Sequence, residues 1–203
     1  MKIFFVRHGE SEANTQNEFS NRGVRHPLTT RGVEQVTELG KRLKVLSFTE
    51  VYTSPILRAI QTTEILCEGL GIPSFVVDYN LREYDVGIFE GRSDKTSWAE
   101  LTLLEESWTA EENQNKSIEG GESFAEIQER FERFYKNLVS TSTGTEAKVL
   151  VVSHGGLLKV GLPKVVKNLF YRDLLKNGIG NCEVLVAEAV KGDLGVSVKR
   201  RKL

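Results

Sequence analysis

Several residue types that mark whole classes of protein are scarce in this chain of 203 residues. It contains only two cysteines, Cys67 and Cys182, and three histidines, so it offers no ligand set for a structural zinc ion. One cysteine lies in a helical pattern and the other at the start of a predicted strand, which is typical of reduced, buried thiols. We predict no disulfide, no bound metal and no cofactor.

Long apolar runs and a strong charge of one sign are also missing. The first apolar stretch, residues 2–6, is too short for a signal peptide or a membrane span. The formal net charge is -1, which gives no general attraction to nucleic acid or to an anionic membrane surface. We therefore predict a cytoplasmic protein without nucleic-acid or membrane partners, and the sequence leaves assembly into a homodimer open.

What the chain does contain is a regular alternation of strand and helix patterns, with 39% hydrophobic residues to build a core. Strands are predicted at residues 2–6, 51–53, 75–77, 148–152, 182–189 and 194–198, with a hairpin turn at Lys191-Gly192-Asp193. Helices are predicted after Thr29 or Thr30, after Ser54-Pro55, around Trp98 to Trp108, from the capping box of Ser123 and Glu126, and over residues 157–170. This order predicts one domain over residues 1–203, a three-layer α/β/α sandwich with a mostly parallel central sheet and a C-terminal hairpin.

Two of these strands end next to a histidine that is followed by glycine. Residues 2–6 lead into Arg7-His8-Gly9-Glu10, and residues 148–152 lead into Ser153-His154-Gly155. Parallel buried strands end at one edge of their sheet, where loops and helix N-termini form a ligand crevice. We therefore expect His8 and His154 to meet in one pocket, with the guanidinium group of Arg7 beside them.

A cationic pocket that holds two imidazoles suits a phosphoryl group. Guanidinium and imidazole groups can bind its oxygens, and a neutral histidine can attack phosphorus and carry the group covalently. Arg7 favours the neutral form of His8 by like-charge repulsion. A backbone carbonyl bound to the other ring nitrogen of His8 would fix the tautomer.

Two further parts of this chemistry have candidates in the sequence. Arg58 lies in the first turn of the helix predicted after Ser54-Pro55, where it can act as a second clamp on an anion. A general acid is also required, and Glu83, Asp85 and Glu90 are candidates in one loop that can cross the sheet edge.

Six groups of motifs follow one another along nearly the whole chain. They are Arg7-His8-Gly9-Glu10-Ser11 with Asn14, Pro27-Leu28-Thr29 with Arg31-Gly32, Ser54-Pro55 with Arg58-Ala59 and Gln61-Thr62, Leu81-Arg82-Glu83 with Gly87 and Glu90-Gly91, Gly120-Gly121-Glu122-Ser123, and Ser153-His154-Gly155-Gly156. In this order the motifs resemble those of the histidine phosphatase superfamily, also called the phosphoglycerate mutase-like family. One such group would be a weak signal, whereas six in series are specific.

The resemblance implies roles for the matching residues of the pocket. His8 resembles the residue that becomes phosphorylated, and Arg7, Arg58 and His154 resemble the rest of the phosphate pocket. Gly155, next to His154, is implied as part of the same binding site.

The resemblance also implies the acid and one amide of the site. Glu83 resembles the proton donor, which protonates the leaving oxygen and then activates water for hydrolysis of phosphohistidine. Asn14 is implied as a hydrogen-bonding partner of the phosphoryl group. This pattern needs no metal, since guanidinium and imidazole groups supply the positive field that magnesium provides in kinases.

Residues 15–27 and one helix carry further candidates for substrate contact. His26 stands where relatives often have Asp before Pro-Leu-Thr, so it would either contact substrate at the pocket mouth or lie on the loop surface. Arg22 and Arg25 share this loop and could meet a second anionic group of the substrate. Lys159 could reach the phosphate rim, but we interpret it as a solvated helix lysine.

Hydrolysis and transfer to a second hydroxyl would both pass through phospho-His8. Residues 92–119 form a predicted specificity insertion with a net charge of -4 from three basic and seven acidic side chains. Such an insertion should repel a heavily phosphorylated ligand unless its charges face solvent. We therefore predict a metal-independent phosphomonoesterase, a histidine acid phosphatase-like phosphoric monoester hydrolase, acting on a small phosphorylated metabolite. The alternative is a phosphoglycerate mutase-type phosphotransferase.

Three features leave a choice between interpretations. Trp98 and Trp108 are either an apolar wall of the substrate site or core residues. A catalytically silent phospho-ligand binding protein would share the fold, although every catalytic position of the family is filled here. The basic run at residues 199–202 is interpreted as a solvated terminus.

Overall fold

The computed structural model describes residues 1–23, 25–141, 146–190 and 193–201. Its six-stranded sheet has the order β3-β2-β4-β1-β5-β6. The strands are β1 Lys2–Arg7, β2 Glu50–Thr53, β3 Val76–Val77, β4 Lys148–Ser153, β5 Val184–Val190 and β6 Asp193–Arg201. Strands β1 to β4 pair in parallel, whereas β5 pairs antiparallel with both β1 and β6, so the predicted mostly parallel sheet and C-terminal hairpin are confirmed. Lys191 and Gly192 of the predicted turn lie outside the described residues.

Strands β1 and β4 form the centre of the sheet and are buried on both faces. Ile3 and Phe5 of β1 point into one hydrophobic cluster, whereas Phe4 and Val6 point into another. This alternation follows from the pleat of a strand, which sends successive side chains to opposite faces. The sheet therefore needs a helical layer on each side.

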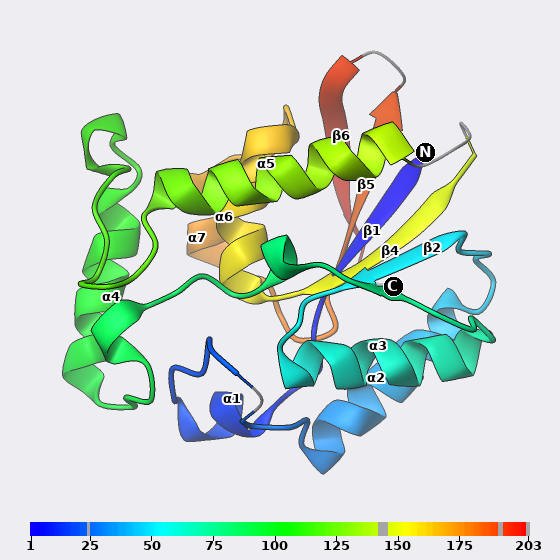
Figure 1. The fold of residues 1–203 in the computed structure, drawn as a ribbon, viewed down its shortest axis with the longest axis horizontal. Helices are drawn as coiled ribbons and strands as arrows, with labels where there is room; N and C mark the ends of the chain where they lie inside the picture. The colour runs from blue at the N-terminus through cyan, green and yellow to red at the C-terminus, as the bar shows by residue number, and fades with distance from the viewer. Residues whose placement is uncertain (24, 142–145, 191–192, 202–203) are drawn as a thin grey trace.

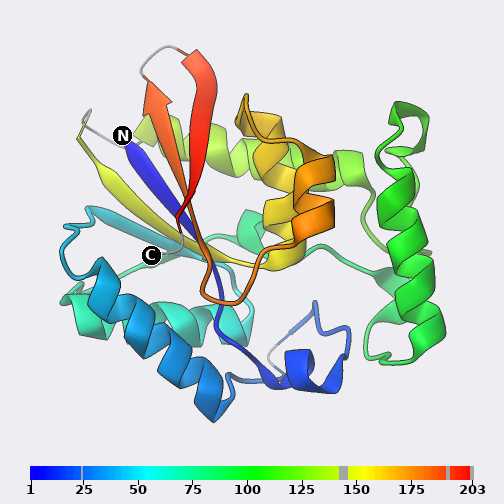
Figure 2. The same ribbon diagram turned by 180° about the vertical axis from the view of Figure 1, so that it is seen from behind.

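Helices cover both faces of the sheet (Figures 1 and 2). The helices are α1 Glu12–Gln16, α2 Thr30–Leu43, α3 Leu57–Leu70, α4 Lys95–Ser107, α5 Phe124–Thr141, α6 Gly155–Val165 and α7 Tyr171–Asn177, with short 3-10 turns η1 Tyr79–Leu81, η2 Gly87–Phe89 and η3 Glu111–Asn113. Helices α2 and α3 lie on one face, α5 and α6 lie on the other, and α4 stands beyond the end of the sheet. The predicted three-layer arrangement is confirmed.

Local sequence signals explain where two of these helices begin. Thr29 caps α2 by accepting a hydrogen bond from the Gly32 N–H. Ser123 and Glu126 form the predicted capping box at the start of α5, because the Ser123 N–H donates to Glu126 Oε2 at 2.8 Å and the Glu126 N–H donates to Ser123 Oγ at 3.4 Å.

The prediction of one helix over residues 157–170 is wrong. Helix α6 ends at Val165, Val166 adopts extended backbone angles, and a separate helix α7 follows. Pro163 lies inside the last turn of α6 and has no N–H to donate, which weakens the helix at that point. Helix α1 is not among the predicted helices, since its five residues are too few to give a periodic signal.

The described residues bear on two further expectations, which concern disulfide bonds and membrane-spanning helices. Cys67 and Cys182 are both free, as predicted, although Cys182 is only half-buried. None of the described helices is both long enough and apolar enough to cross a membrane.

Candidate active site

The carboxyl ends of the two central strands bring two histidines together. Arg7 pairs with Ser153 in the register of β1 and β4, so the next residue of each strand lies at the same sheet edge. The ring centroids of His8 and His154 are 5.1 Å apart. The two residues are only 2% and 0% exposed. The structure therefore places both imidazoles in one buried site, as the strand pattern predicts.

The hydrogen bonds of His8 define its tautomer. Arg58 Nε lies 3.0 Å from His8 Nε2, and a guanidinium group can only donate, so Nε2 accepts. Nδ1 then carries the proton and donates to the Gly9 carbonyl at 2.6 Å. Burial, followed by the charges of Arg58 and Arg7, lowers the pKa of His8 well below its ordinary value. The ring is therefore neutral, with its lone pair on Nε2.

Two arginines flank this ring. Arg58 is buried in the first turn of α3 and donates from Nη1 to the Ser20 carbonyl at 2.6 Å. Burial lowers the pKa of Arg58 to about 10, which leaves it charged at neutral pH. Arg7 donates from Nη1 to the Ile179 carbonyl at 2.6 Å. We call Arg7, His8, Arg58 and His154 the phosphate cradle.

The cradle contains buried polar atoms without a protein partner. Among the described residues, Arg7 Nε and His154 Nδ1 are two of the three buried side-chain nitrogen or oxygen atoms that have no hydrogen bond. His154 Nε2 lies 2.6 Å from Ser54 Oγ, which itself accepts from the Ile56 N–H. The Ser54 hydroxyl can donate to Nε2, and in that tautomer Nδ1 carries the ring proton and is a donor. Buried donors are normally paired, so this arrangement suits an anion.

Glu83 lies in the loop between η1 and η2 and points toward the start of α6. Its Oε2 accepts from the Gly156 N–H at 2.9 Å, and its Oε1 accepts from the Leu157 N–H at 2.7 Å and from the Tyr84 N–H at 2.9 Å. The N-terminus of α6 thus orients the carboxyl group of Glu83. A Cβ atom on Gly156 would lie 2.6 Å from Glu83 Oε1 and 2.4 Å from the Tyr84 ring, so glycine is required there.

A cavity of about 330 Å³ opens in front of the cradle. Its wall includes six residues of the predicted site: Arg7, His8, Asn14, Arg58, Glu83 and Gly155. The remaining wall comes from the loop after α1, from α4, from α6 and from the residues after α7, and it includes Glu18, Phe19, Trp98, Leu101, Glu105, Lys159 and Ile179. The sheet edge and the insertion therefore enclose one site between them.

Asn14 is one of these six residues of the cavity wall, and its Oδ1 accepts from the Ser11 N–H at 3.1 Å. The other three residues of the predicted site, His154, Arg22 and His26, are not among the lining residues. Arg22 binds both carboxylate oxygens of Asp85, at 2.9 and 2.6 Å. His26 Nδ1 lies 2.9 Å from Ser20 Oγ. The prediction of Arg22 and His26 as substrate contacts is therefore not supported by their positions.

The interpretation of Lys159 as a solvated lysine is wrong. Its side chain is 15% exposed, lines the cavity and lies 2.6 Å from Glu105 Oε1. The same oxygen accepts from the Tyr84 hydroxyl at 2.8 Å. Glu105 comes from α4 in the insertion, so this partner of Lys159 has no local signal in the sequence.

Most of the negative charge of the insertion faces solvent, so it does not act against a phosphorylated ligand as predicted. Six of its seven acidic residues are exposed, and Glu105 alone among the seven lines the cavity. The two tryptophans of the insertion have different roles. Trp98 lines the cavity and stacks on Phe19 with ring centroids 4.0 Å apart, whereas Trp108 is buried in the core.

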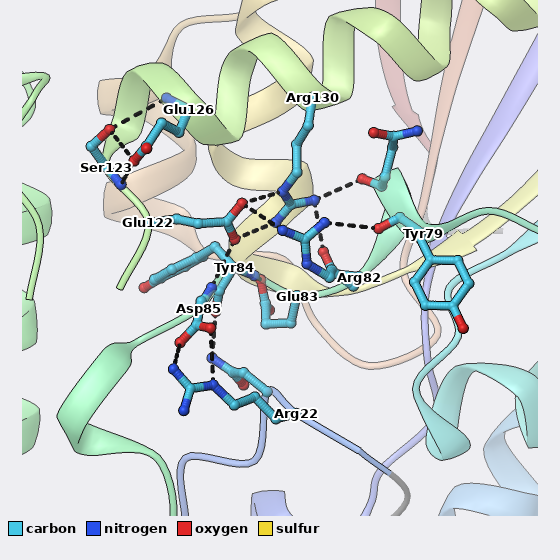
Figure 3. A network of polar contacts seen from close by, with 12 residues as sticks. Arg22, Tyr79, Arg82, Glu83, Tyr84, Asp85, Glu122, Ser123, Glu126 and Arg130 are labelled. Atoms are coloured by element: carbon cyan, nitrogen blue, oxygen red, sulfur yellow. Dashed lines mark hydrogen bonds and ion pairs between the residues drawn. The ribbon is translucent and has the colours of Figure 1, made fainter. Parts of the chain in front are cut away.

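Glu122 and Arg130 bind each other and backbone groups on both sides of Glu83 (Figure 3), and no sequence pattern predicts these contacts. Glu122 belongs to a recognised motif, Gly120-Gly121-Glu122-Ser123, but the motif alone does not reveal its partner. In the part of the chain that the structure describes, no three His, Cys, Asp or Glu side chains are grouped so as to hold a metal ion.

The sequence matches a known family and several known proteins. The sequence pattern of the histidine phosphatase superfamily (branch 1) matches residues 3–199. A protein described as probable phosphoglycerate mutase GpmB, from Salmonella typhi, is 30% identical over 158 residues, which cover 76% of this chain and 70% of that protein.

Solved structures show the same fold. YhfR of Bacillus stearothermophilus is 27% identical with a TM-score of 0.81, and the match covers 98% of this chain and 96% of that one. The alpha-ribazole phosphatase of Shigella flexneri is 23% identical with a TM-score of 0.80, over 100% of this chain and 96% of that one. The chain belongs to branch 1 of the histidine phosphatase superfamily, whose members act on phosphate esters.

Proposed function

We propose that the protein is a phosphomonoesterase that works through phospho-His8 without a metal ion. One observation carries the proposal. A buried neutral imidazole with its lone pair on Nε2 lies beside two arginines, and the buried donors Arg7 Nε and His154 Nδ1 have no partner in the described chain. A phosphoryl group supplies acceptor oxygens for those donors and an electrophile for the lone pair.

In the first step, His8 Nε2 attacks phosphorus. A bond forms between Nε2 and phosphorus while the ester bond between phosphorus and oxygen breaks. Glu83 in its protonated form gives its proton to the leaving oxygen, so the alcohol departs neutral. Arg58 Nε, which donates to Nε2 in this structure, must turn from the ring to the phosphoryl oxygens as the new bond forms.

In the second step, water releases the phosphoryl group. The carboxylate of Glu83 takes a proton from the water molecule as its oxygen attacks phosphorus. The bond between Nε2 and phosphorus breaks, orthophosphate leaves, and both His8 and Glu83 return to their starting protonation states. Arg7, Arg58 and His154 provide the donors for charge that develops on the phosphoryl oxygens.

The charges of the cavity wall favour hydrolysis of a substrate with one phosphate. Beyond Arg7 and Arg58, the charged lining residues are Lys159 and the three carboxylates Glu18, Glu83 and Glu105. Lys159 is already paired with Glu105, so the lining residues outside the cradle offer a second phosphate group no unpaired cation. A volume of about 330 Å³ lies at the small end of ligand sites, which suits a small phosphorylated metabolite.

A second candidate is phosphoryl transfer of the phosphoglycerate mutase type. It is favoured by the Salmonella relatives described as probable phosphoglycerate mutase, at 30 to 31% identity. Transfer would use the same phospho-His8 and would replace water by a second substrate hydroxyl. The two reactions therefore differ in the acceptor and not in the cradle.

The test is an assay of p-nitrophenyl phosphate in EDTA, with the wild type and His8→Ala compared. We expect the wild type to release nitrophenol and the variant to be inactive. Activity that survives His8→Ala would exclude the phosphohistidine route, and loss of wild-type activity in EDTA would exclude metal independence. Isomerisation of 3-phosphoglycerate that depends on a bisphosphate primer would favour the mutase.

A further inference from the structure

Residues 82–86, which carry Glu83, lie between the 3-10 turns η1 and η2 and belong to no helix or strand. Backbone polar groups in such a segment need other partners, and here side chains from distant parts of the chain supply them. The Arg82 carbonyl accepts from Arg130 Nη1 at 3.0 Å, and the Tyr84 carbonyl accepts from Asn21 Nδ2 at 2.8 Å. The position of Glu83 therefore depends on residues outside its own loop.

Glu122 and Arg130 form the central pair of this arrangement (Figure 3). Arg130 Nε donates to Glu122 Oε1 at 2.7 Å and Nη2 donates to Oε2 at 3.0 Å, while Nη1 also donates to the Asn80 carbonyl at 2.7 Å. Glu122 Oε2 accepts from the Asp85 N–H at 2.9 Å. Arg130 is 2% exposed, so the pair is held in one bidentate geometry rather than averaged in solvent.

The segment that carries Glu122 lies directly against the loop of Glu83. The Glu122 N–H donates to the Asp85 carbonyl at 2.8 Å, and the Ile88 N–H donates to the Glu119 carbonyl at 2.9 Å. A Cβ atom on Gly121 would lie 2.7 Å from the Asp85 carbonyl oxygen. The glycines before Glu122 thus allow the close approach that brings its carboxylate to the Asp85 N–H.

We propose that Glu122 and Arg130 are positioning residues for Glu83. They bind backbone groups on both sides of it, at residues 80, 82 and 85, and so set where its carboxyl group lies relative to His8. This inference rests on the proposed role of Glu83 as general acid. Neither residue touches the cavity, so each acts through the loop and not on the substrate.

A positional role differs from a purely structural one in what it changes. A displacement of about 1 Å at a reacting group can lower a rate about 10²-fold even when the fold is intact. If Glu83 moves, the loss falls on substrates whose leaving oxygen needs a proton. Leaving groups that depart readily as anions are affected less.

The experiment compares kcat/KM for phenyl phosphate and p-nitrophenyl phosphate, two esters of similar shape whose leaving groups differ in their need for an acid. We expect Glu122→Gln to lower kcat/KM for phenyl phosphate about tenfold more than for p-nitrophenyl phosphate. Glu83→Gln should show the same selectivity and a larger total loss. A uniform loss on both esters in Glu122→Gln would overturn the proposal.

Two further variants separate position from folding. Glu126→Gln is the matched control, because Glu126 lies at the same helix start but bonds to Ser123 and not to the loop; we expect it to lower the melting temperature without changing the ratio of the two esters. The double variant Glu122→Leu with Arg130→Met keeps the site filled by apolar groups. A folded double variant with the wild-type ratio of kcat/KM for the two esters would also overturn the proposal.

The same data distinguish failure of this inference from failure of the proposed function. If the wild type hydrolyses neither ester, the phosphomonoesterase proposal fails. If Glu83→Gln affects both esters equally, Glu83 is not the acid, and the positioning role falls with it. If Glu83→Gln is selective and Glu122→Gln is not, only the positioning role is wrong.

Discussion

The phosphate cradle and the loop of Glu83 face the same cavity but are held in place by different means. His8 and His154 directly follow β1 and β4, and Arg58 lies in the first turn of α3, so regular backbone hydrogen bonds fix their positions. Glu83 lies in a loop, where its carboxyl group is bound by N–H groups of α6 and the backbone on either side of it is bound by Glu122 and Arg130. The cradle is therefore a property of the sheet edge, whereas the placement of Glu83 also depends on long-range side-chain contacts.

The largest loss of activity is expected for a substitution in the cradle. We predict that Arg58→Ala lowers kcat/KM for any phosphomonoester substrate about 10³-fold, because it removes a buried donor from the site where charge develops. Steady-state kinetics with p-nitrophenyl phosphate measures the loss.

Arg31→Ala is the control for this variant. The Arg31 side chain is 74% exposed, and its ion pair with Glu10 is at the surface, so activity should stay near that of the wild type. A loss of less than about tenfold in Arg58→Ala would mean that the cradle does not carry the reaction.

Two neighbouring glycines of α6 sharpen the contrast between cradle and loop. A Cβ atom on Gly156 would meet Glu83 and the Tyr84 ring at 2.6 and 2.4 Å, whereas a Cβ atom on Gly155 would meet Arg7 at 3.3 Å. We predict that Gly156→Ala lowers kcat/KM about 10²-fold by displacing Glu83, the proposed acid.

Gly155→Ala should have a smaller effect, since the Arg7 side chain needs to move by only a few tenths of an ångström. Parallel kinetics and melting temperatures of the two variants check the order. Equal activity in both would show that the loop of Glu83 moves without consequence for catalysis.

The smallest expected effect is on the pH dependence of kcat/KM, and it depends on His8 in the cradle. Burial, Arg58 and Arg7 lower the pKa of His8 below its ordinary value of 6.5, so the neutral nucleophile persists as the pH falls. An imidazole with an ordinary pKa would lose about tenfold in activity one pH unit below that value. We predict a smaller loss in kcat/KM there, after correction for the ionisation of the substrate.

Protein stability should depend on pH in the matching direction. The folded pKa of His8 lies below the unfolded one, so protonation favours the unfolded chain. The contribution of His8 to the free energy of unfolding is therefore fully present above pH 6.5, and it falls as the pH drops below 6.5 toward the folded pKa. Urea unfolding across this range, with wild type and His8→Asn compared, measures the contribution. For the activity, a fall in kcat/KM on acidification that already begins at or above pH 6.5 would contradict a buried neutral His8 ring.

The sequence was sufficient to predict the parts of the site that belong to regular elements. The runs before His8 and His154 predicted two parallel strands, and parallel strands share an edge, so their convergence followed. The capping box at Ser123 and Glu126 and the threonine cap of α2 were also readable, because the partners are three residues apart.

The rest depends on pairs that lie far apart in the chain. Glu105 and Lys159 are separated by 54 residues, and the Asp85 N–H finds its acceptor on Glu122 across 37 residues. A single sequence gives no signal for such pairs, so it predicts neither the burial of Lys159 nor the partner of Glu122. The break between α6 and α7 was missed for a different reason, since Pro163 in a last turn can be tolerated or can end a helix.

The most direct test of the account is to trap the phosphorylated protein. Wild type and Glu83→Gln are mixed with p-nitrophenyl phosphate, quenched in alkali, where phosphohistidine is stable, and mapped by mass spectrometry. The account predicts phosphate on His8, with more accumulated in Glu83→Gln if its release is slowed more than its formation. Phosphate on His154 or on another residue, or active protein that never carries phosphate on His8, would contradict it.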